Sequence, residues 1–82
     1  MKIELYQRIV LNRDVPEESL KQGDMAWLID YVKHPSGGEE GAILEVFNVL
    51  GESIDVVTVP VSAIDLPRED QIPSARTIER VK

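Results

Sequence analysis

Two apolar runs joined by a short polar turn, AILEVFNVL (residues 42–50) and IDVVTVP (residues 54–60), decide the fold. Both runs are rich in the β-branched and aromatic residues that favour strands. Gly51-Glu52 makes a tight turn between them, and either Asn48 or Gly51 can supply a positive φ there. Pro60 closes the second run because proline cannot donate to a strand ladder. We therefore expect an antiparallel hairpin.

The run before this hairpin, residues 25–32, is apolar on both faces of the strand that it predicts. One face carries Met25, Trp27, Ile29 and Tyr31, and the other carries Ala26, Leu28, Asp30 and Val32. A strand with one wet face alternates cleanly between apolar and polar residues. Residues 42–50 show the same two-sided character, so we expect both faces of both strands to be at least partly covered.

The remaining segments complete a small all-β domain. Residues 5–11 read as a first strand and residues 14–24 as a loop, with one helical turn after Pro16 and a turn at Gly23-Asp24. Residues 34–41 form a mobile loop, residues 61–63 fit a single 3₁₀ turn, and residues 64–66 a short last strand. This order predicts a single five-stranded SH3-like barrel over residues 1–66.

Residues 67–82 read as a C-terminal tail, either flexible or a short docking segment. They contain two prolines and several charges, with Ile72, Ile78 and Val81 scattered among them. Ser74 could cap a helix over residues 75–82, although so short a helix is marginal alone in water.

Length and composition narrow the classes of function. The chain has 82 residues, enough for one small domain, and no cysteine, so disulfides and cysteine-ligated zinc are impossible. The alternating N-terminus does not read as a signal peptide, and no apolar run is long enough to span a membrane. We expect a cytoplasmic protein that does not engage a membrane.

The charge argues against nucleic-acid binding by the barrel. The formal net charge is −6, and residues 1–66 hold 12 acidic and five basic residues, a net of −7. Nucleic-acid binding draws much of its affinity from Lys and Arg at phosphates. The basic surplus lies only in the tail, so the folded part should repel a phosphate backbone.

Three pieces of the sequence together resemble a known family. They are DVPEESLKQGD (residues 14–24), LEVFN with its following Gly51-Glu52 (residues 44–52), and VVTVP (residues 56–60). In this order they resemble the small bacterial family catalogued as domain of unknown function 4926, over roughly residues 4–66. The resemblance implies a compact SH3-like barrel and no established activity.

No side-chain constellation predicts catalysis or ligand chemistry. His34 is followed by Ser36 in a glycine-rich loop, but nothing fixes the pair as a nucleophile and base. Glu39 and Glu40 lack the ligand spacing of a calcium loop, and their charge would repel phosphate from the neighbouring glycines. We expect no enzymatic activity, no cofactor and no metal.

Glu45 interrupts an otherwise apolar face of the predicted strand over residues 42–50. Its carboxylate should reach solvent at the rim or find a donor, for which Arg8 is a candidate.

The strongest candidate for partner binding is the strand face of residues 25–32 that carries the aromatic side chains. If Ala26 and Leu28 face the core, Trp27 and Tyr31 lie in an exposed stripe of the kind enriched at protein interfaces. The alternatives put Trp27 in the core, or let the tail cover the stripe with Ile72 and Ile78. The sequence leaves these open.

We therefore expect an acidic module that binds a protein partner through Trp27, Tyr31, Glu39 and Glu40, and its charge would suit a basic partner. An antitoxin or immunity protein acting on a neighbouring small protein is the most concrete version. The alternative is a weak nucleic-acid or ribosome-associated module that uses Arg76, Arg80 and Lys82 of the tail. A homodimer through the stripe is compatible with both.

Overall fold

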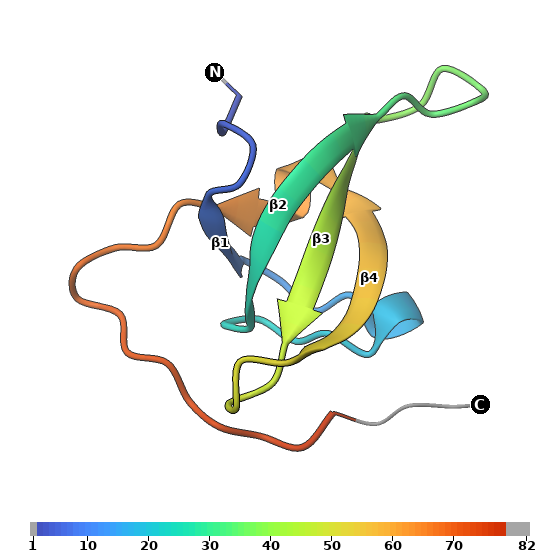
Figure 1. Ribbon diagram of the computed structural model, residues 1–82. Coiled ribbons are helices and arrows are strands. Elements are labelled where there is room, and N and C mark those ends of the chain that lie inside the picture. The colour runs from blue at the N-terminus through green and yellow to red at the C-terminus, as the bar shows by residue number, and fades with distance from the viewer. Residues whose placement is uncertain (1, 79–82) are drawn as a thin grey trace.

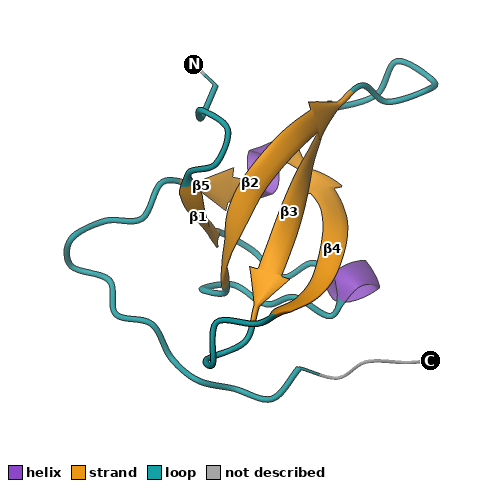
Figure 2. Ribbon diagram, viewed as in Figure 1, coloured by secondary structure: helices purple, strands orange, loops and turns teal. Residues whose placement is uncertain are grey.

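The computed structural model describes residues 2–78 (Figure 1). Its elements are β1 (Arg8–Leu11), the 3₁₀ turn η1 (Pro16–Glu18), β2 (Met25–Val32), β3 (Gly41–Phe47), β4 (Ser53–Pro60), the 3₁₀ turn η2 (Val61–Ala63) and β5 (Ile64–Asp65). No α-helix occurs among these residues (Figure 2), and none of their helical segments is long and apolar enough to cross a membrane. The predicted all-β class and five strands are confirmed.

The strands form one antiparallel sheet in the order β4-β3-β2-β1-β5. Within residues 2–78 no pairing joins β4 to β5, so the sheet is open and these strands are its edges. The predicted first strand is too long, because residues 5–7 precede β1. The predicted β3–β4 turn is correct, and Gly51 takes the positive φ, +82°.

A single apolar core lies against one face of this sheet. Its largest fully buried side chains come from four strands: Ile9, Leu11, Leu28, Leu44 and Val59. Strand β3 alternates: Ala42, Leu44 and Val46 are buried, whereas the residues between them are half-buried. We call the core side the inner face and the opposite side the outer face. The core contains no buried polar or charged residue among those described.

A β-bulge divides β2 into two halves of opposite parity. Leu28 pairs with Leu44, but Asp30, not Ile29, pairs with Ile43, so Ile29 is the extra residue. One extra residue moves every later side chain to the other face. Ala26 and Leu28 are buried before the bulge, and Tyr31 packs against the core after it.

The C-terminal segment leaves β5 and runs past the β3–β4 turn (Figure 1). Residues 75–78 are not helical, so the predicted helix is wrong over these residues; its remainder, 79–82, lies outside the described residues. The extended chain instead brings Arg76 to Asp24 and lets Ile78 pack against the core. These contacts outweigh a helix with only marginal stability of its own.

Candidate protein-binding surfaces

The outer face carries a row of four side chains in register across the sheet. Arg8 pairs with Trp27, Trp27 with Glu45, and Glu45 with Val56. Trp27 is 38% exposed and Val56 is also exposed. We call these four residues the outer-face row. It combines an aromatic, an aliphatic and two opposite charges on one exposed surface.

Local contacts hold this row in place. The guanidinium of Arg8 lies over the Trp27 ring, 5.3 Å from Cζ to the ring centroid, in a cation–π contact. Glu45 Oε2 accepts a hydrogen bond of 2.7 Å from the Ser53 hydroxyl. Glu45 thus has a hydrogen-bond donor, one of the two outcomes predicted. The donor is Ser53, whereas Arg8 contacts the Trp27 ring.

The predicted aromatic stripe does not exist as one surface. Trp27 precedes the bulge and faces outward, whereas Tyr31 follows it and packs against the core. The Tyr31 hydroxyl donates a hydrogen bond of 2.5 Å to the Ile3 carbonyl. Nor do the two tail isoleucines predicted to cover Trp27 do so: Ile72 is 89% exposed, and Ile78 packs against the core.

Glu39 and Glu40, predicted as binding residues, both bond within the chain. The Ser62 amide donates to Glu39 Oε2 at 2.6 Å, and its hydrogen bonding lowers the pKa of that carboxyl. Glu40 pairs with Lys2 at 2.8 Å, and the same ammonium lies 4.6 Å from the centroid of the Tyr31 ring. Glu40, Lys2 and Tyr31 therefore form one cluster, apart from Glu39.

The His34 side chain bonds within its own loop. His34 Nδ1 accepts a hydrogen bond of 3.1 Å from the Ser36 amide, and the loop is exposed. Residues 2–78 contain no group of three acidic, His or Cys side chains placed to hold a metal ion.

A second surface, which the sequence did not predict, lies where the C-terminal segment crosses the end of the sheet. Arg76 donates from Nε to Asp24 Oδ1 at 2.9 Å and from Nη2 to Asp24 Oδ2 and to the Ser19 carbonyl. Burial alone would raise the pKa of Asp24. Hydrogen bonds from Arg76 and from the Lys21 amide, together with the Arg76 charge, outweigh it and lower that pKa. No sequence signal links residues 52 positions apart.

Comparison with protein-family models found no match, and comparisons with curated proteins and with solved structures found none either.

Proposed function

We propose that the chain is an SH3-like barrel that acts as a non-enzymatic, acidic protein-binding module. The order of elements supports the barrel: a strand, a long loop, a three-stranded meander, a 3₁₀ turn and a short strand. The strand order also supports it, because β5 lies beside β1 at the far end of the sheet from β4. Membership of the family catalogued as domain of unknown function 4926 fits the same architecture.

The observation that carries the proposed function is the exposure of Trp27 in the outer-face row. Trp and Arg are the side chains most enriched at the energetic centres of protein interfaces. Here Arg8 stacks on Trp27, and Val56 adds a second exposed apolar side chain on the other side of Glu45. A partner that covers this row buries an aromatic side chain already fixed by its neighbours, which limits the entropy lost on binding.

Charge defines the partner. Residues 1–66 carry 12 acidic and five basic residues, a net charge of −7. Electrostatic complementarity therefore favours a partner whose binding surface has basic residues around an apolar centre. An antitoxin or immunity role in the cytoplasm, against a basic toxin, is the concrete form of this proposal.

The nucleic-acid alternative is less well supported. Of its three cationic residues, Arg76 is bound by Asp24 and the Ser19 carbonyl, and Arg80 and Lys82 lie outside the described residues. A phosphate would have to compete with Asp24 for this guanidinium.

The test is affinity capture from the source organism with the tagged wild-type chain, Trp27→Ala and Ile72→Ala, each with and without nuclease. Ile72 is exposed and lies outside the outer-face row, so Ile72→Ala is the matched control. The recovered protein is then purified, and its affinity for the three chains is measured at low and high salt.

We expect to recover one protein whether or not nuclease is added. It should bind Ile72→Ala as tightly as wild type and Trp27→Ala at least tenfold more weakly. Its affinity should fall with salt, because charge contributes. Recovery that nuclease abolishes, or equal binding to Trp27→Ala, would overturn the proposal.

A further inference from the structure

The turn between β3 and β4 displays two adjacent aliphatic side chains to solvent. Val49 is 84% exposed and Leu50 is 78% exposed, and neither belongs to the buried core of the described residues. Single exposed aliphatic residues are ordinary on a protein surface. Two neighbours at the end of a hairpin form a compact apolar projection, which we call the apolar tip, and exposed apolar patches commonly mark interaction sites.

Asn48 holds the backbone of the apolar tip in one conformation. Its Oδ1 accepts hydrogen bonds from the Leu50 amide at 3.0 Å and from the Glu52 amide at 2.9 Å. Its Nδ2 donates to Glu52 Oε1 at 2.9 Å, and its carbonyl accepts from the Gly51 amide at 3.0 Å. A projection whose backbone is already fixed loses little entropy when another surface covers it.

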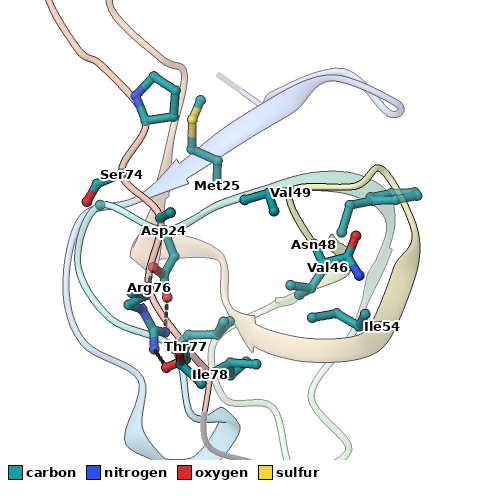
Figure 3. Close-up of a pocket in the computed structure, with 15 residues that line it drawn as sticks. Asp24, Met25, Val46, Asn48, Val49, Ile54, Ser74, Arg76, Thr77 and Ile78 are labelled. Carbon is teal, nitrogen blue, oxygen red and sulfur yellow. Dashed lines mark hydrogen bonds and ion pairs between the residues drawn. The ribbon is translucent and has the colours of Figure 1, made fainter.

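A groove of about 550 Å³ lies beside this tip, between residues 73–78 and the end of the sheet (Figure 3). Val49 lines the groove, so the projection and the groove are neighbours at one end of the molecule. In Figure 3, Val46, Val49 and Ile54 stand across the open space from Arg76. The wall on the sheet side is largely apolar: Leu20, Met25, Val46, Phe47, Val49 and Ile54. Apolar concave surface of this size suits an apolar occupant.

The groove is electrically neutral although the chain has a formal net charge of −6. Among the described residues that line it, only Asp24 and Arg76 are charged, and they pair with each other. A second copy can therefore approach the groove without meeting an unpaired like charge there, whereas the net charge opposes contact elsewhere. A basic partner gains no such advantage at this end.

We propose that this end of the molecule is a self-association site, in which Leu50 of each copy enters the groove of the other. The projection and the groove belong to one patch, so a single twofold axis satisfies both contacts. The occupant comes from a second copy, because Leu50 is exposed and does not line the groove of its own chain. Burial of the tip supplies apolar contacts that so small a domain gains little of from its own core.

This site goes beyond the proposed function and shares no residue with the outer-face row. Either proposal can fail alone, since Trp27→Ala tests the row and Leu50→Asp tests the tip.

The first test is sedimentation equilibrium of the full-length wild type, Leu50→Asp, Leu66→Asp and Trp27→Ala, each at low and high salt. Leu66 is an exposed leucine that does not line the groove, so Leu66→Asp is the matched control for Leu50→Asp.

We expect wild type, Leu66→Asp and Trp27→Ala to dimerise with equal affinity, and Leu50→Asp to dimerise at least tenfold more weakly. High salt should strengthen the wild-type dimer, because it screens the repulsion between two acidic copies. This sign is opposite to the salt dependence expected for a basic partner. A wild type that stays monomeric at millimolar concentration, an unchanged dimer in Leu50→Asp, or a dimer lost in Trp27→Ala would each overturn the proposal.

The second test identifies the contact itself by cross-linking. The chain has no cysteine, so each single-cysteine variant carries one reactive thiol. Leu50→Cys is mixed with Ser74→Cys, whose position lines the groove, or with Ser36→Cys in an exposed loop, and a short bifunctional maleimide is added. We expect at least tenfold more cross-linked product with Ser74→Cys than with Ser36→Cys. Equal yields from the two mixtures would overturn the proposal.

Discussion

Trp27 and Tyr31 lie on opposite faces of the sheet although they are four residues apart on one strand. A regular strand would place them on the same face. The bulge at Ile29 adds one residue between them, and the Asp30 carboxylate accepts the Tyr31 amide at 2.8 Å beside it. Trp27 is therefore available to a partner, while Tyr31 holds the N-terminal segment to the core.

The position of Trp27 predicts its fluorescence. It is the only tryptophan in the chain, so the emission reports the outer-face row alone. We expect acrylamide to quench native Trp27 substantially, because the ring is 38% exposed. Arg8→Ala should increase that quenching by uncovering the ring, with a change in stability within about 0.5 kcal/mol, as for most surface substitutions. A native emission that resists quenching would place Trp27 in the core.

The Tyr31 hydroxyl predicts a selective stability loss. Tyr31→Phe removes the hydrogen bond to the Ile3 carbonyl and should lower the free energy of unfolding by about 1 kcal/mol. Tyr6→Phe is the matched control, because Tyr6 is 71% exposed, and it should change this free energy by less than about 0.5 kcal/mol. Urea denaturation of the two variants measures both. Equal effects would mean that the Tyr31 hydroxyl has no special role.

The strands were predictable because their signals are local. Residues 42–60 carry apolar runs, a Gly turn and a closing proline, and the hairpin follows from these alone. The bulge in β2 was not predicted, since apolar residues occupy both faces of the strand there and nothing in the pattern marks a shift of register. Its one local sign is Asp30, a short polar residue inside an apolar strand that bonds its neighbour's amide.

The candidate sites depended on contacts between distant residues, and these were poorly predictable. Trp27 was identified because a large aromatic is conspicuous in any pattern. The pair of Asp24 and Arg76 was not, since 52 residues separate them and each is an ordinary charged residue where it stands. Glu40 was identified as a surface charge, but its pairing with Lys2 depends on the path of the N-terminus.

The close packing around Gly41 predicts a context-dependent substitution. A Cβ at this position would lie 2.9 Å from Thr58 Cγ2 and 3.0 Å from Val32 Cγ1. Both neighbours are β-branched and cannot easily rotate away. Gly41→Ala should therefore destabilise the chain by about 1–2 kcal/mol. In a Val32→Ala, Thr58→Ser background the same change should be neutral or stabilising, because the steric conflict is gone and the unfolded chain loses freedom. Equal costs in both backgrounds, measured by urea denaturation, would refute this account.

The pairing of Asp24 with Arg76 predicts how stability responds to acid. The pKa of Asp24 is lower in the folded chain than in the unfolded one, so the folded state binds this proton more weakly. Its contribution is complete above the unfolded pKa, about 3.9, and is lost as pH falls through the folded value. Because the pair is only partly buried, we expect about 1 kcal/mol at neutral pH.

The measurement is the difference in unfolding free energy between wild type and Asp24→Asn across the acid range. The difference cancels groups common to both chains, including Glu18, whose raised pKa acts with the opposite sign. It should shrink steadily below about pH 4. In an Arg76→Ala background most of the difference should vanish at every pH, because Arg76 supplies most of the stabilisation. A difference that persists in acid, or that survives the loss of Arg76, would show that Asp24 stabilises the chain through the Lys21 amide instead.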